Sequence, residues 1–188
     1  MTKTGFVSDI EAIRTQARKN IEDGAVTQGY KADKKAVIKV LNDALATELV
    51  CVLRYKYHHF MAKGINSEPV ATEFLEHANE EQMHADRIAT RIVQLGGTPD
   101  LNPDTLVKRS HSQYQQGNTL IEMIKEDLVA ERIAIDTYRD IIKFLGEDDT
   151  TSRRLMEEIL EKEEEHADDM ANLLSQLSPS DNGGKTAK

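Results

Sequence analysis

Apolar residues recur every three or four positions along four long stretches of the chain, which is the spacing of one face of an α-helix. This pattern predicts helices over about 33–63, 67–96, 118–146 and 150–177. Glycines follow the first three stretches, where they can end a helix. Two connections between the helices are short and the second of the three is long. The fold class is therefore expected to be all-α, a single four-helix bundle over residues 33–177 with a long crossover between its second and third helices.

The segments outside these helices have a different composition. Residues 1–32 form an N-terminal extension that could hold a short helix, begun by a capping box of Ser8 and Glu11 and packed on a neighbouring element. The long crossover is polar and contains prolines, and a second short helix is expected at 104–114. The tail, residues 178–188, has almost no apolar residues and is expected to be disordered.

Composition excludes several classes of function. The net charge of −9 disfavours a general binder of nucleic acid or of anionic membranes, because either would be repelled. A single cysteine, Cys51, rules out an internal disulfide or a Cys-x-x-Cys site, and is interpreted as a small buried thiol. No apolar leader begins the chain, and no run of about 18 apolar residues occurs in it. We expect a cytoplasmic protein that does not enter membranes.

Each predicted helix carries one glutamate where its apolar stripe calls for an aliphatic side chain. On two helices a histidine follows three residues later and so lies on the same face. One Glu-x-x-His pair would mean little in a chain so rich in glutamate, but two pairs on two core faces indicate a shared site. The candidate site residues are Glu48, Glu81, His84, Glu131, Glu163 and His166.

These side-chain types point to metal chemistry. Four carboxylates buried together would repel one another, and each would lose its hydration. Two divalent cations would neutralise the four negative charges. Carboxylate and imidazole ligands suit iron, manganese or zinc rather than copper(I) or an iron–sulfur cluster. Six ligands leave coordination positions open for an oxidant, so we expect the same six residues to be both the metal ligands and the catalytic groups.

Four segments, taken together, resemble the helix motifs of the bacterioferritins in the di-iron ferritin-like superfamily. They are LNDALATELVCVLRY at 41–55, EEQMHADR at 80–87, DLVAER at 127–132 and EILEKEEEHADD at 158–169. The resemblance implies a ferritin-like bundle with two iron ions per chain, for which manganese or zinc could substitute. It also implies that Glu81 and Glu163 bridge the two metals. The pairs Glu48 with His84 and Glu131 with His166 would complete one metal each.

The function that the resemblance implies is that of a ferroxidase. Such a protein oxidises Fe(II) to Fe(III) with oxygen or hydrogen peroxide, and stores or detoxifies the iron as mineral inside a homo-oligomeric cage. Acidic residues beside the site on the last helix could line the interior or a pore of the cage and attract cations; they are Glu157, Glu158, Glu161, Glu164 and Glu165.

Three features depart from the bacterioferritin pattern. Gln82 stands where the family has a methionine that ligates haem, and Met83 lies about 100° further round the helix, so haem is not expected. The tail has nothing like the fifth helix of the 24-subunit cages. The long crossover is closer to that of the Dps-type dodecamers. We therefore expect a dodecamer rather than a 24-mer.

Two other classes of function remain open at this point. One is a non-storing oxidoreductase with iron or manganese, of the peroxidase or catalase type. The other is a Dps-like shell that protects DNA, although the net charge disfavours nucleic acid as a partner.

Several other residues have simpler interpretations. His77 is expected to support the site rather than to bind metal, and Tyr55 and Tyr138 to be core aromatics. The remaining histidines, His58, His59 and His111, are expected at the surface.

Overall fold

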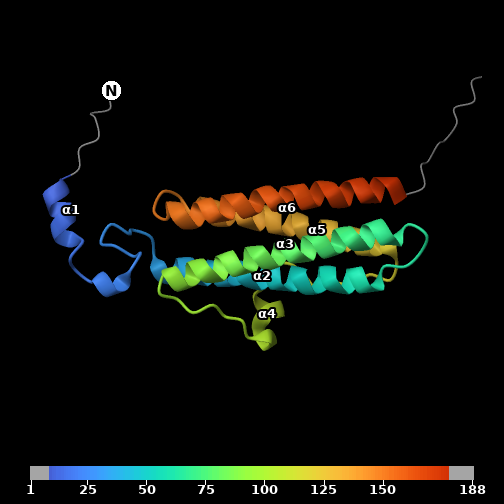
Figure 1. The fold of residues 1–188 in the computed structure, drawn as a ribbon, viewed down its shortest axis with the longest axis horizontal. Coiled ribbons are helices and arrows are strands. Elements are labelled where there is room, and N and C mark those ends of the chain that lie inside the picture. The colour runs from blue at the N-terminus through green and yellow to red at the C-terminus, as the bar shows by residue number, and fades with distance from the viewer. Residues whose placement is uncertain (1–8, 178–188) are drawn as a thin grey trace, which may run out of the picture.

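The computed structural model describes residues 9–177, and all of the regular structure in this range is helical. Four long helices lie side by side in one bundle (Figure 1): α2 Lys34–Met61, α3 Ser67–Gln94, α5 Leu120–Leu145 and α6 Thr150–Leu177. The predicted four-helix bundle is confirmed, and each helix begins and ends within about two residues of the predicted position. The predicted disorder of 178–188 falls outside the described residues.

The bundle consists of two helical hairpins. Helices α2 and α3 are joined by a short turn, as are α5 and α6, and each pair packs closely along its length. The crossover from α3 to α5 has to travel back along the whole bundle, because α5 begins at the end opposite to the one where α3 stops (Figure 1). This geometry explains the length of the crossover, which carries the short helix α4, Pro103–Arg109. The predicted helix at 104–114 thus exists but is shorter.

Local capping explains where the helices begin. The Asp33 side chain accepts hydrogen bonds from the backbone N–H groups of Lys35 and Ala36 and so caps α2. Helix α5 is capped by Thr119, whose hydroxyl accepts from Glu122 N–H, and not by Asn118 as the sequence suggested. Asn118 contributes its backbone N–H instead, which donates to the Glu122 carboxylate. The cap therefore lies one residue later than predicted.

The N-terminal extension contains two short elements at one end of the bundle, α1 (Ile10–Gln16) and a 3-10 helix η1 (Ile21–Asp23) (Figure 1). Asp9 caps α1, and Ser8 of the predicted capping box lies outside the described residues. Ile10 and Ile13 are about half exposed, so this helix buries no apolar face within the described chain. The following segment does pack, because the Tyr30 hydroxyl donates to Asp149 in the α5–α6 turn at 2.8 Å.

The apolar core falls into two clusters with a polar layer between them. One cluster, around Leu41, Ile88 and Tyr138, fills the end where α2 begins, and the other, around Phe74 and Met170, fills the opposite end. The six candidate site residues lie between the clusters along the four helices. The bundle thus supplies a dry, rigid wall on both sides of the site.

A second polar group is buried beside the site, and the sequence analysis missed it. The Arg54 guanidinium donates to Asp127 at 2.8 Å, and also to the Ser112 hydroxyl and the Gln113 carbonyl oxygen at 3.1 Å. His58 completes the group with its Nδ1 2.8 Å from Asp127 Oδ2. The prediction that His58 lies at the surface is wrong: its side chain is fully buried, because it packs against Phe74 of α3 and Asp127 of α5. His111 is exposed and His59 is half-buried.

We expect Asp127→Ala to destabilise the protein by about 3–5 kcal/mol, because it leaves the Arg54 charge buried without its partner. Asp140→Ala is the matched control, since Asp140 lies on the same helix in an exposed pair with Lys143, and should change stability by about 0.5 kcal/mol or less. Urea unfolding of the two metal-free variants and the wild type, at one fixed protein concentration, measures both changes in stability. Equal midpoints for the two variants would show that the buried pair contributes little.

Candidate metal centre

All six candidate residues meet in the middle of the bundle. None has more than 4% of its surface exposed. Each of the four long helices supplies one glutamate, and α3 and α6 each add a histidine one turn later. The structure therefore places together every residue that the sequence pattern selected, and places none of them at the surface.

The six residues form two overlapping sets that could each hold a metal ion. Potential ligand atoms lie within 4.8 Å of one another in the set Glu48, Glu81, His84, Glu163 and again in the set Glu81, Glu131, Glu163, His166. Glu81 and Glu163 belong to both sets. This is the geometry expected of two adjacent cations with two shared carboxylates, each completed by one further glutamate and one histidine.

The ligand atoms within each set lie close together, but several of them make no hydrogen bond within the described residues. His84 Nδ1 lies 3.1 Å from both Glu48 Oε2 and Glu163 Oε1, and His166 Nδ1 lies 3.4 Å from Glu81 Oε1. Within residues 9–177, both carboxylate oxygens of Glu81 and of Glu163 have no hydrogen-bond partner, and neither does His166 Nδ1. Buried polar atoms without partners are costly, whereas cations between them would satisfy all of these atoms at once. The residues present fit a di-metal site.

Two tyrosines hold the unshared carboxylates in place. Tyr55 donates a hydrogen bond to Glu131 Oε1 at 2.6 Å, and Tyr138 donates to Glu48 Oε1. Both tyrosines are fully buried core aromatics, as predicted. The carboxylates shared by the two sets receive no such bond. The protein thus orients the outer glutamates through its own hydroxyl groups and leaves the shared pair free.

The crowding of carboxylates shows in the direction of their pKa shifts. Burial, together with the Glu81 charge, raises the pKa of Glu48 to about 8, and the same two causes hold the pKa of Glu163 well above its usual range. Burial also opposes ionisation of Glu81. The neighbouring imidazoles of His166 and His84 overcome that effect and keep the pKa of Glu81 well below its usual range.

The pKa values of the two site histidines are raised, whereas burial alone lowers the pKa of an imidazole. Burial lowers their pKa values, but the Glu48 and Glu81 carboxylates raise that of His84 to about 10, and Glu81 with its neighbours raises that of His166 to about 9. Without metal, both imidazoles are therefore protonated at neutral pH and offset part of the negative charge. A cation binding here must displace these protons, so metal affinity rises with pH.

Three residues around the site complete the description. His77 lies outside both sets: its ring stacks on His166 with centroids 4.0 Å apart, and its Nδ1 lies 3.2 Å from the Tyr55 hydroxyl. Glu80, which the sequence analysis overlooked, places Oε2 2.6 Å from His166 Nε2. Its place one residue before Glu81 puts it at the edge of the same helix face, which was the available signal. Cys51 is buried, as predicted, and burial raises the pKa of its thiol.

Two glutamates and two Glu-x-x-His pairs that project into the core of a four-helix bundle are typical of one class of helical proteins, which hold two metal ions between the helices. Residues 38–179 match the model of the ferritin-like domain, and the chain belongs to that family. The predicted resemblance is thereby confirmed.

Individual relatives support the same placement. The bacterioferritin of Brucella melitensis is 32% identical over 145 residues, which cover 76% of this chain and 84% of that protein. A nutrient stress-induced DNA-binding protein of Synechococcus is 27% identical over 180 residues, covering 93% of this chain and 96% of the relative. Among solved structures, the dodecameric, bacterioferritin-related thioferritin of Bacteroides fragilis is 32% identical with a TM-score of 0.74, covering 78% of this chain and 88% of that chain.

We expect the metal-free protein to lose stability as the pH rises from about 5 to about 8. A carboxyl whose pKa is raised in the folded state, as for Glu48 and Glu163, opposes folding increasingly above its unfolded pKa. A histidine whose pKa is raised, as for His84 and His166, stabilises the fold at low pH and loses that effect as the pH passes its folded pKa. Both effects have the same sign in this range. The melting temperature of chelator-treated protein measures their sum.

Zn²⁺ should reduce this pH dependence, because the cations neutralise the carboxylates directly. Glu163→Gln should also flatten the profile of the metal-free protein, while Glu164→Gln, an exposed neighbour paired with Arg139, should leave it unchanged. A melting temperature that stays constant from pH 5 to pH 8 without metal would contradict the charge crowding described here.

Proposed function

We propose that the protein is a ferroxidase, which oxidises Fe(II) to Fe(III) at the six-residue centre and stores or detoxifies the product inside a homo-oligomeric cage. One observation carries this proposal: two overlapping, buried sets of ligand atoms share Glu81 and Glu163, whose oxygens have no hydrogen-bond partner in the described part of the chain. Membership of the ferritin-like family and the likeness to bacterioferritin support it. The alternative is that the protein stores no mineral and uses the same site, with iron or manganese, as an oxidoreductase of the peroxidase or catalase type.

In this proposal the two ferrous ions are the substrate. Glu48, His84 and the shared pair Glu81 and Glu163 would hold one ion, and Glu131 and His166 with the same pair would hold the other. Each Fe(II) gives up one electron, and the two electrons with two protons reduce oxygen to hydrogen peroxide or hydrogen peroxide to water. The negative carboxylates favour the more highly charged ferric product, because Coulomb attraction in the dry core grows with the charge of the ion.

The chain's own groups prepare the site for this reaction. His84 and His166 are protonated in the metal-free site and release those protons as the ions bind. Tyr55 and Tyr138 keep Glu131 and Glu48 in position through their hydroxyl groups. The apolar clusters on both sides exclude bulk water from the centre.

The cage is proposed to be a dodecamer. The crossover helix α4 packs on α2 on the outside of the bundle, where it is available for contacts between subunits (Figure 1). The relative from Bacteroides fragilis is described as dodecameric. Mineral storage requires such an enclosed volume, because one bundle encloses only its own site.

The acidic residues of α6 that could line a cage are mostly paired within the chain. Four of these five carboxylates form ion pairs with basic neighbours: Glu157 with Arg153, Glu158 with Arg87 and Arg154, Glu164 with Arg139, and Glu165 with Lys162. DNA binding, which is named for the Synechococcus relative, is disfavoured for this chain, because the chain's own net charge of −9 would repel DNA.

Glu81→Ala should abolish rapid Fe(II) oxidation, since it removes a ligand from both sets. Loss of a group that only supports a metal ligand typically lowers activity about 10–100-fold, so loss of this shared ligand should lower the oxidation rate at least as much. The fold should survive, because the apolar clusters on both sides of the site hold the four helices together. Stopped-flow absorbance after aerobic Fe(II) addition measures the rate. Glu76→Ala, on the exposed side of the same helix, is the control. Oxidation at the wild-type rate in Glu81→Ala would refute the assignment.

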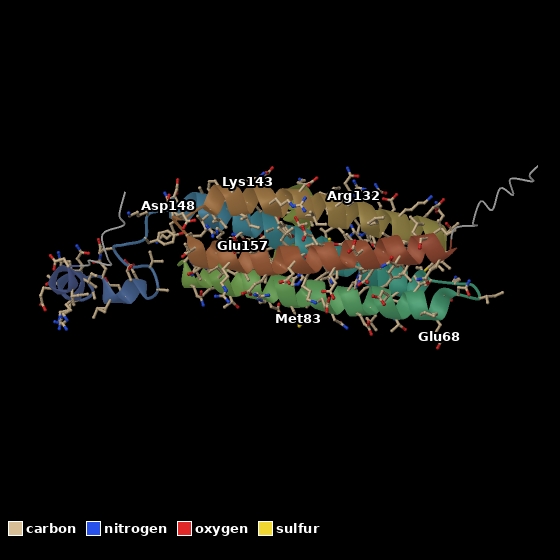
Figure 2. All side chains as sticks on the ribbon, turned by 90° about the horizontal axis from the view of Figure 1, so that it is seen from above. Glu68, Met83, Arg132, Lys143, Asp148 and Glu157 are labelled. Carbon is tan, nitrogen blue, oxygen red and sulfur yellow. The ribbon has the colours of Figure 1, made fainter. Side chains whose placement is uncertain are left out.

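Haem is expected to be absent from the purified protein. Gln82 donates to Asp86 at 2.9 Å, and Met83 points away from the bundle with 56% of its surface exposed (Figure 2). Neither residue can take the place of a methionine ligand directed into a subunit contact from position 82. Absorption spectra of protein produced with added haem test this, and a Soret band that is lost on substituting Met83 would show that a different ligand is used.

Native mass spectrometry should give twelve times the chain mass of 21.1 kDa. A mass of twenty-four chains would reverse the proposed size but keep a cage. A dimer or monomer that still oxidises Fe(II) would favour the non-storing alternative, because no enclosed volume would remain for the mineral.

A further inference from the structure

A third group of metal-ligating side chains lies next to the six-residue centre but outside it. His77 of α3 directs Nε2 at two carboxylates: Glu73 Oε1 of its own helix at 3.3 Å and Asp169 Oδ2 of α6 at 3.6 Å. Potential ligand atoms of the three residues all lie within 4.8 Å of one another. His77 was expected only to support the six-residue centre, and the proposed ferroxidase reaction gives no role to Glu73 or Asp169.

The hydrogen bonds around His77 indicate which of its nitrogens carries the proton. The Tyr55 hydroxyl donates to Glu131, so its oxygen accepts from His77 Nδ1, 3.2 Å away. With that proton on Nδ1, a neutral imidazole has its lone pair on Nε2. Among the residues that the structure describes, His77 Nε2 has no hydrogen-bond partner, although only 3% of the residue is exposed.

Three acceptors therefore face one another without a donor. The Nε2 lone pair and two carboxylates converge, and burial with the Asp169 charge raises the pKa of Glu73. A cation between them would remove this repulsion. The spacing suits one: ligands about 2.1 Å from a metal ion lie about 3.0 Å apart at right angles and about 3.4 Å apart in a tetrahedron. The observed 3.3 and 3.6 Å are close to these values.

We propose that Glu73, His77 and Asp169 form a third divalent-cation site, separate from the six-residue centre. Its nitrogen and oxygen ligands suit first-row divalent ions such as Zn²⁺ or Fe²⁺. The site goes beyond the proposed ferroxidase reaction, since cation binding there requires no oxidation.

The location of the third site makes it accessible from solvent. The side chains of Glu73 and Asp169 are 33% and 42% exposed, while the His77 ring between them and the centre stacks on His166. Three protein ligands leave further positions to water, which favours exchange. A cation here therefore stands between solvent and the buried centre, separated from the latter by two stacked imidazole rings.

Zn²⁺ binding to chelator-treated full-length protein tests the proposal, because Zn²⁺ is not oxidised and forms no ferric mineral. We expect the wild type to bind one more Zn²⁺ per chain than Asp169→Asn, measured by equilibrium dialysis and elemental analysis. Glu73→Gln should lose the same ion. Both residues are partly exposed, so the variants should keep the fold, which circular dichroism checks. Asp168→Asn, the exposed neighbour with the same charge change, should bind as many ions as the wild type.

The pattern of loss separates this proposal from the previous one. Equal Zn²⁺ binding by wild type and Asp169→Asn would overturn the third site and leave the ferroxidase centre intact. Loss of an ion in Asp168→Asn as well would overturn it too, by showing only general attraction to an acidic surface. A wild type whose single bound ion is lost in Asp169→Asn would support the third site and contradict the di-metal centre.

Discussion

The burial of four glutamates at one level of a helical bundle is the constraint on which the rest of this structure depends. Like charges in a dry core repel strongly, and each carboxylate also loses its hydration. Within the described residues the protein offsets this with two imidazoles, two tyrosine hydroxyls and shifted pKa values, yet five carboxylate oxygens remain without a partner. The apolar clusters on either side keep the helices together despite this strain. The bundle is therefore built to receive positive charge, and its stability and its chemistry have the same origin.

Much of this architecture could be predicted from the sequence because it depends on periodicity. The glutamates interrupt otherwise apolar stripes, and a helix fixes which face each of them occupies. Thus Glu48 and Glu131, with no histidine partner in their own helices, were still placed correctly in the core. The resemblance to bacterioferritins added the sharing of Glu81 and Glu163, and the geometry is consistent with it.

The remaining features could not be predicted because they depend on which helices meet. Periodicity places Arg54, His58 and Asp127 near apolar positions, but the packing of α2 beside α5 and the path of the crossover decide that they are buried together. In the same way, Asp169 lies on the edge of α6 and becomes a partner of His77 only once α3 packs beside it. The cap at Thr119 rather than Asn118 is a smaller case, in which two adjacent residues had nearly equal preference and local hydrogen bonds decided.

The two-hairpin arrangement has a consequence for how the molecule is held together. The α2–α3 hairpin contributes Glu48, Glu81 and His84, and the α5–α6 hairpin contributes Glu131, Glu163 and His166. Each hairpin thus supplies three of the six residues, and each four-residue set contains one carboxylate from the opposite hairpin. Any ion seated in either set would span the seam between the two halves of the chain. Bound cations would therefore cross-link the two hairpins, and the affinity for these cations would depend on how stably the two hairpins pack together.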